Sequence, residues 1–95
     1  MIEVTAPLWL WSGGQGSWHF LTVPADQAVV LKLQAMAERR GFGSVRVTAR
    51  IGATEWRTSV FPQKDGGYIL PVKAAVRRKA GIAEGDVVRL TLDPL

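Results

Sequence analysis

The sequence contains no cysteine and a single histidine, His19. Without cysteine the chain has no disulfide framework, no thiolate nucleophile and no Cys-based zinc site. One histidine excludes an acid–base relay built on two histidines and argues against a His-cluster metal site. No nucleophile, base and acid stand out together among the other residues. We therefore expect a protein that is not an enzyme and that has no metal or other cofactor.

Long apolar runs and a strong excess of one charge are absent too. No stretch of about 18 apolar residues occurs, which predicts no transmembrane helix. The first residues, Met1–Val4, lack the basic region and apolar run of a signal peptide, so we expect a cytoplasmic location. The net charge is +4, from 12 Lys and Arg against 8 Asp and Glu, far below that of chains that coat nucleic acid.

The composition that remains is that of an ordinary globular protein with several tryptophans. A length of 95 residues suits one domain, residues 1–95, and is too short for two. The hydrophobic fraction of 47% excludes disorder as the main state. The four tryptophans are therefore the first residues to consider as a binding surface.

Alternating apolar and polar residues predict strands, and glycine-rich stretches predict the turns between them. The strands are 2–11, 18–23, 44–51, 56–61, 68–70 and 87–92, and Pro7 indicates an edge or a bulge in the first. In that strand one face carries Ile2, Val4, Ala6, Leu8 and Leu10.

Two of the turns predict specific partners across a hairpin. A turn centred on 13–16 sets Trp11 opposite Trp18 and Trp9 opposite Phe20, and such aromatic pairs stabilise a hairpin. A turn over 52–55 sets Arg57 opposite Arg50.

Two helices are predicted as well. The first opens at Pro24–Asp26 with Asp26 as its N-cap, and it ends with Arg39 and Arg40 before Gly41. The second covers about 72–80 and ends at Gly81. The buried face of the first helix is expected to comprise Val29, Val30, Leu33, Met36 and Ala37.

The two halves of the chain, about 1–51 and 52–95, follow the same order of elements. Each reads strand, turn, strand, proline, helix, glycine, strand, with Trp9 and Trp56, and likewise Pro24 and Pro71, separated by 47 positions. Two such ββαβ units can close on each other into one barrel with a pseudo-two-fold axis, which removes exposed strand edges. The alternative is that a small α+β chain alternates in this way by chance.

Three stretches resemble motifs of a bacterial family of small proteins that is catalogued only as domain of unknown function nineteen-oh-five. They are Gly16-Ser17-Trp18-His19-Phe20 with Val23-Pro24, the run from Gly52 to Pro62, and the run from Tyr68 to Asp86. The resemblance implies a double-split β-barrel related in fold to AbrB-type swapped-hairpin regulators, and residues 77–92 are similar to the tail of that hairpin. It implies no activity and no catalytic residues.

Those regulators build their barrel from two chains, whereas this chain holds both halves. We therefore expect a mainly β chain with two helices, an α+β barrel, that is a monomer, with a homodimer as the alternative.

The aromatic residues of the first hairpin are the first candidate site. Aromatic side chains supply apolar walls with a polar handle, so they are typical of a groove for a small ligand or a partner protein. The alternative is that they form the barrel core and a hairpin staple. The candidates are Trp9, Trp11, Trp18, Phe20 and Trp56.

Basic residues form the second candidate site. Arg46, Arg50 and Arg57 share the outer side of the second hairpin, where an anion or the carboxylate of Glu55 would relieve their repulsion. Basic stripes of this kind are typical of nucleic-acid binding, and more often they are simply solvated. A second patch on the short helix comprises Lys73, Arg77, Arg78 and Lys79.

The sequence therefore predicts a non-enzymatic binding or interaction module that holds a partner protein or a small ligand at its aromatic residues. The alternative is a nucleic-acid-binding barrel that uses the arginine face.

Overall fold

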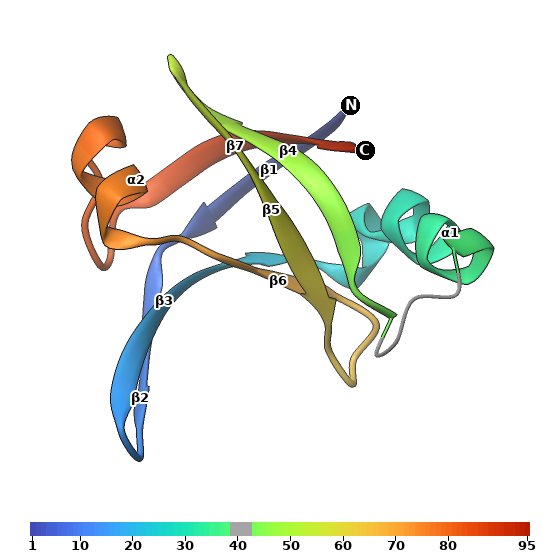
Figure 1. Cartoon of the computed structure of the whole chain (residues 1–95), viewed down its shortest axis with the longest axis horizontal. Coiled ribbons are helices and arrows are strands. Elements are labelled where there is room, and N and C mark those ends of the chain that lie inside the picture. Colours follow the sequence, from blue (N-terminus) through green and yellow to red (C-terminus); the bar gives the residue numbers. More distant parts are fainter. Residues whose placement is uncertain (39–42) are drawn as a thin grey trace.

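The computed structural model describes residues 1–38 and 43–95. Within them the chain forms seven strands, one short 3-10 helix and two α-helices, so the predicted mainly β fold with two helices is confirmed (Figure 1). Neither α-helix has the length and apolar character that crossing a membrane requires. The elements are β1 (Ile2–Pro7), β2 (Trp9–Gly13), β3 (Gly16–Val23), η1 (Ala25–Gln27), α1 (Val29–Glu38), β4 (Val45–Ile51), β5 (Thr54–Pro62), β6 (Tyr68–Pro71), α2 (Ala74–Ala80) and β7 (Val87–Pro94).

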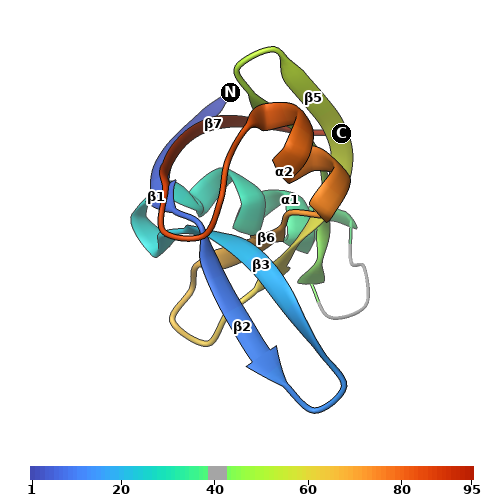
Figure 2. The ribbon, with the colours of Figure 1, turned by 90° about the vertical axis from the view of Figure 1, so that its left-hand side faces the viewer.

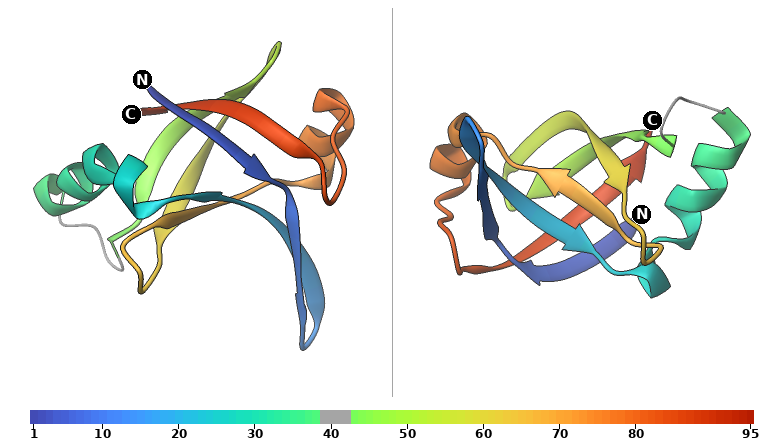
Figure 3. Two further views of the ribbon diagram at one scale, coloured as in Figure 1. Left: turned by 180° about the vertical axis from the view of Figure 1, so that it is seen from behind. Right: turned by 90° about the horizontal axis from the view of Figure 1, so that it is seen from below.

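The strands form one curled antiparallel sheet in the order β1-β7-β4-β5-β6-β3-β2. The sheet wraps around a common interior to form a barrel, and α1 and α2 lie at opposite ends of it (Figure 3). Every second side chain of a strand points inward, which is why the predicted alternation reappears as a core. The buried strand residues include Val4, Leu21, Val45, Val47, Ala49, Val60, Leu70, Val88, Leu90 and Leu92.

The predicted strand 2–11 is two strands, because the chain changes direction at Leu8. β1 pairs with β7 at one end of the sheet, and β2 pairs with β3 at the other end. Leu8 is buried between them, and its backbone N–H donates to the carbonyl of Asp86 at 2.9 Å. Its own carbonyl accepts from Gly85 N–H at 2.8 Å. Leu10 lies beyond this corner and is exposed, so the prediction that it shares one strand face with the buried Ile2, Val4, Ala6 and Leu8 is wrong.

The two halves of the chain make matching strand pairs. The pair β1–β7 corresponds to the pair β5–β4, and the pair β2–β3 corresponds to the pair β5–β6. The single strand β5 thus corresponds to β1 and β2 together. The remaining pairs, β3 with β6 and β4 with β7, join equivalent strands of the two halves and are antiparallel, as a two-fold relation requires. This pairing is the pattern that two ββαβ units predict, and a common origin of the halves stays a prediction.

The pairing also shows that Trp9 and Trp56 are not equivalent positions. Trp56 lies opposite Ala49, and its counterpart in the first half is Ile2, which lies opposite Leu92. Pro24 directly follows β3 and Pro71 ends β6. The spacing of 47 residues therefore relates equivalent positions for these two prolines but not for the two tryptophans.

The β2–β3 hairpin is longer than its counterpart in the other half, the β5–β6 pair. It has the predicted register, with Trp11 opposite Trp18 and Trp9 opposite Phe20, and it projects from the barrel as an arm (Figure 2). β5 and β6 are instead joined by a short turn, closed by a hydrogen bond of 2.8 Å from Gln63 N–H to the Gly67 carbonyl. The outer part of the hairpin, beyond the Trp9–Phe20 pair, therefore has no matching strand pair in the second half.

The first helix departs from its prediction at both its start and its buried face. Asp26 lies in η1 and makes no capping hydrogen bond, and α1 begins only at Val29. The residues that face the barrel are Ala28, Leu31 and Ala35, at spacings of three and four. The predicted buried face is exposed instead, with Leu33 at 61% and Met36 at 66%. The cause is tertiary, because α1 lies across an end of the barrel and only one side of it contacts protein. The predicted helix end, Arg39 to Gly41, lies outside the described residues.

α2 ends as predicted at Gly81, which adopts the left-handed conformation with φ of 69°. Such a residue is the usual end of a helix because glycine has no Cβ to clash. The helix is anchored by Val76 and Ala80, which pack against the core.

Two matched substitutions test which face of α1 is buried. Leu31→Ala removes a fully buried side chain and is expected to lower the free energy of unfolding by about 2–5 kcal/mol. Leu33→Ala, two positions along, is expected to change it by less than about 0.5 kcal/mol because Leu33 is solvated. Urea denaturation followed by circular dichroism measures both. A larger loss for Leu33→Ala would show that the sequence-based face is the buried one.

Candidate functional site

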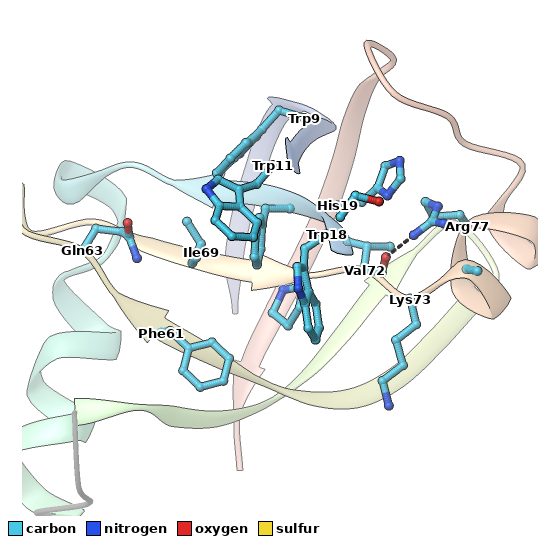
Figure 4. Close-up of a pocket in the computed structure, with 14 residues that line it drawn as sticks. Trp9, Trp11, Trp18, His19, Phe61, Gln63, Ile69, Val72, Lys73 and Arg77 are labelled. Atoms are coloured by element: carbon cyan, nitrogen blue, oxygen red, sulfur yellow. Dashed lines mark hydrogen bonds between the residues drawn. The ribbon is translucent and has the colours of Figure 1, made fainter. Parts of the chain in front are cut away.

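A groove of about 810 Å³ lies where the β2–β3 hairpin leaves the barrel (Figure 4). One wall is the hairpin, and the other is built from the end of β5, from β6 and from the start of α2. The apolar part of its lining includes Trp9, Trp11, Trp18, Phe20, Phe61 and Ile69. Four of these six residues are among the five aromatic candidates identified from the sequence.

The hairpin places its aromatic rings on one face because β2 and β3 alternate in register. Trp9 and Phe20 lie opposite each other, with ring centroids 5.1 Å apart and planes tilted by 40°. The indole N–H of Trp9 donates to Thr22 Oγ1 at 2.9 Å, so its polar atom is satisfied and the ring is held as a wall. Trp11 and Trp18 lie further out and are 48% and 55% exposed. These two rings are surface, not core.

Trp56 is the aromatic candidate that the structure separates from the others. It lies on β5 opposite Ala49, is half-buried and packs against the core. It does not line the groove. Each of the two interpretations of the aromatic residues therefore applies to part of the set. Trp56 packs against the core, and the aromatic residues of the β2–β3 hairpin line the groove.

The opposite wall contains residues that the sequence did not suggest as site residues. Phe61 lies opposite Ile69 where β5 passes from β4 to β6, and Pro71 and Val72 continue this wall toward α2. Phe61 is 42% exposed. The sequence signal available was a phenylalanine followed by Pro62 at the end of a predicted strand. Its meaning depends on β6 lying beside β3, which the sequence does not show.

The charged residues of the groove are all basic. Lys73 and Arg77 lie toward one end, and Phe61 and Gln63 lie toward the other (Figure 4). Arg77 is half-buried, and its Nη1 donates to the Val72 carbonyl at 2.6 Å, which holds the guanidinium in place. The described residues that line the groove include no aspartate or glutamate. The groove is therefore an apolar cleft with a positive end.

His19 stands beside this positive end. It is half-buried, and its carbonyl accepts a hydrogen bond of 2.9 Å from Val72 N–H. Its ring lies between the groove and a smaller hollow that includes Arg78 and Glu84. Arg77 lines both the groove and this smaller hollow, whereas Arg78 lines the smaller hollow and not the groove.

The arginine face of the second hairpin lies apart from the groove. The turn is the two-residue Gly52–Ala53, with Gly52 at φ of 58°, rather than the predicted four-residue turn. This register sets Glu55 opposite Arg50, so the predicted pairing of Arg50 with Arg57 is wrong. The alternative partner, the Glu55 carboxylate, is correct.

Arg50 Nη2 lies 2.7 Å from Glu55 Oε1 in an exposed ion pair. The hydrogen bond and the charge of Glu55 raise the pKa of the Arg50 guanidinium above its ordinary value. Arg46 lies opposite Ser59 and Arg57 opposite Thr48, so these two arginines face polar, uncharged neighbours. One of the three candidate cations on this face is therefore already neutralised.

Two carboxylates that stand in turns serve to hold those turns. Asp65 Oδ1 accepts from Gly67 N–H and Asp86 Oδ2 from Ala83 N–H, both at 2.8 Å. Across the part of the chain that the structure describes, no three His, Cys, Asp or Glu side chains gather as metal ligands would.

Comparison with known proteins agrees with the resemblance noted in the sequence. The sequence model of a family described as "Domain of unknown function (DUF1905)" matches residues 5–92, nearly the whole chain. No curated protein matches the chain. The function must therefore be argued from the groove itself.

A glycine beneath Trp11 offers a test of how this ring is placed. A Cβ at Gly13 would lie 2.9 Å from Trp11 Cζ2 and 3.0 Å from Cη2, so Gly13→Ala is expected to push the indole aside. Gly16→Ala, across the same hairpin, meets no atom within 4 Å and is the control. The indole N–H resonance of Trp11 is expected to shift in the first variant only. An equal shift in both would contradict this packing.

Proposed function

The chain belongs to the DUF1905 family, whose description assigns no activity, and we propose that it is a non-enzymatic binding module for a small anionic ligand with a flat apolar body. The ligand occupies the groove between the β2–β3 hairpin and the β6–α2 wall. Its apolar body lies between the aromatic rings, and its anionic group lies toward Lys73 and Arg77.

The observation that carries this proposal is the exposure of aromatic rings on both walls of one groove. Trp11, Trp18 and Phe61 are each more than 40% exposed and line the same cleft. Exposed apolar surface is favourable to cover, at roughly 25 cal/mol for each Å² removed from water. A flat apolar body inserted between the walls covers these rings without rearranging the barrel.

The positive charge of the groove favours an anionic group as the second part of the ligand. Lys73 and Arg77 are its charged residues and both are basic, so an anion meets attraction without competing carboxylates. Arg77 is already positioned by its hydrogen bond to the Val72 carbonyl. A donor that is held in place before binding loses less conformational freedom when the ligand arrives.

The surroundings of His19 support a binding role over a catalytic one. General acid–base chemistry needs a second group that orients or partners the histidine. Glu84 lines the smaller hollow that His19 also lines, but among the described residues no hydrogen bond or ion pair joins these two side chains, and no carboxylate lines the groove itself.

A pair of dyes tests the proposal. Anilinonaphthalene sulfonate combines a flat aromatic body with an anionic group, and N-phenylnaphthylamine has a similar body without the charge. We expect saturable binding of the sulfonate, seen as enhanced dye emission. Trp18→Ala is expected to weaken binding of both dyes because it removes part of the wall.

The charge is tested with two lysines at α2. Lys73→Ala is expected to weaken binding of the sulfonate by about two- to fivefold and to leave the neutral dye unchanged. Lys79→Ala removes the same charge outside the groove and is the control. No saturable binding of the sulfonate, or an equal effect of the two lysine substitutions, would contradict the proposal.

Single-stranded nucleic acid is the second candidate ligand class. Exposed aromatic rings beside basic residues are the features on which single strands stack, and Trp11, Trp18 and Lys73 meet that description. The arginine face lends less support to duplex binding, because Arg50 is paired with Glu55.

Fluorescence anisotropy with labelled single-stranded and duplex oligonucleotides at two salt concentrations compares the two classes. If the groove serves a small anion, we expect no salt-sensitive binding of either oligonucleotide at micromolar protein. Salt-sensitive binding of the single strand that displaces anilinonaphthalene sulfonate would favour the second candidate.

A further inference from the structure

β2, one of the two end strands of the sheet, lacks the protection that free strand edges usually carry. Edge strands are commonly blunted by charged side chains, proline or a covering element. No Asp, Glu, Lys or Arg occurs from Val4 to Ala25. β2 itself contains no proline, and Leu10, Trp11 and Ser12 are all exposed along it. This edge is open to pairing.

The hairpin register shows which backbone groups face the open edge. The two-residue turn at Gly14–Gln15 makes Gly13·Gly16, Trp11·Trp18 and Trp9·Phe20 the hydrogen-bonded pairs of the hairpin. The N–H and carbonyl groups of Leu10 and Ser12 then point away from β3. The neighbouring β3 residue agrees, since the His19 carbonyl points to the far side and accepts from Val72 N–H.

The outer part of the β2–β3 hairpin consists of two paired strands with no third strand beside them. β6 pairs with β3 from Phe20 to Val23, so residues 11–18 form a ribbon of two strands. A two-stranded ribbon is marginally stable in water, and additional strands are what stabilise it. A further strand on β2 would supply this.

We propose that β2 pairs antiparallel with β2 of a second copy of this chain, with Trp11 at the two-fold axis. Leu10 then lies opposite Ser12 of the second copy, and Ser12 lies opposite its Leu10. Of the antiparallel registers, this one engages both outward-facing residues of each strand. The result is a continuous sheet across two barrels.

The strand is complementary to itself, which is why a second copy is the occupant. In an isologous pair an isolated charge on β2 would lie near the same charge of the second copy with no opposite charge to offset it, and β2 carries none. The same register sets Gly13 opposite Trp9 of the second copy, so a bulky ring meets a residue with no side chain.

The pairing meets the proposed binding site at Trp11, which lines the groove and lies at the two-fold axis. Leu10 and Ser12 point to the face opposite Trp9 and Trp11, and neither lines the groove. Substitutions at Leu10 and Ser12 therefore test the dimer without removing a groove residue.

Two double variants test the pairing and its register by sedimentation equilibrium. Leu10→Lys with Ser12→Lys sets like charges opposite each other twice and is expected to weaken the dimer by at least about tenfold. Leu10→Lys with Ser12→Glu sets opposite charges at the same positions and is expected to keep the dimer within about threefold of the unmodified chain. Both side chains are solvated in one copy, so the barrel is expected to fold in both variants.

Saturable binding of anilinonaphthalene sulfonate is expected to be retained in both variants, because neither substituted residue lines the groove. A chain that is monomeric up to millimolar concentration overturns the proposal and leaves the edge to a strand of another protein. A dimer that both double variants retain, or that both lose, overturns the register and with it the proposal. Loss of the dimer in Leu33→Glu alone would move the interface to the exposed face of α1.

Discussion

The architecture depends on the corner at Leu8, where one continuous segment leaves one end of the sheet and enters the other. Leu8 is buried, and both of its backbone polar groups are bonded to the turn at Gly85–Asp86. A buried backbone group without a partner is costly, so this turn and this corner specify each other. Pro7 precedes the corner and has no N–H to contribute to the ladder of β1. The corner therefore fixes how β1 and β2, the two end strands of the sheet, follow one another in the chain.

The corner also decides where the chain can carry a binding surface. Up to Leu8 the apolar side chains enter the common core, and beyond it the hairpin continues past the barrel, where its rings have no core to enter. Trp9 is held by Thr22 and Phe20 at the base of the arm, while Trp11 and Trp18 remain in solvent. The groove arises because the arm stands across from Phe61 and Ile69, which the barrel brings to the same place.

The two-fold pattern of strand pairs makes the hairpin stand out. The barrel needs only a short turn at this point, as the connection from β5 to β6 shows at Gln63–Gly67. The hairpin supplies four aromatic groove residues, Trp9, Trp11, Trp18 and Phe20, and the open edge of β2. One wall of the proposed ligand site and the whole of the proposed dimer contact therefore lie on this hairpin.

Local pattern was sufficient for much of this protein. Period-two alternation placed the strands, and the glycines between Trp11 and Trp18 determined the register of the first hairpin, because both are properties of neighbouring residues. The pattern misled where the environment is asymmetric. The apolar residues of α1 suggested a broad buried face, yet the helix lies at the barrel end and contacts protein along Ala28, Leu31 and Ala35. In the second hairpin a two-residue turn shifted the partner of Arg50 from Arg57 to Glu55.

Which tryptophan belongs to the core and which to the groove was decided only by tertiary structure. Trp56 and Trp18 sit in similar alternating strands, and their sequence neighbours do not distinguish them. The fold does, because Trp56 packs against the core whereas Trp18 lies outside the part of β3, Phe20 to Val23, that pairs with β6. Residue types and spacing determine which side chains share a strand face. What that face meets depends on long-range strand order, and no local period encodes it.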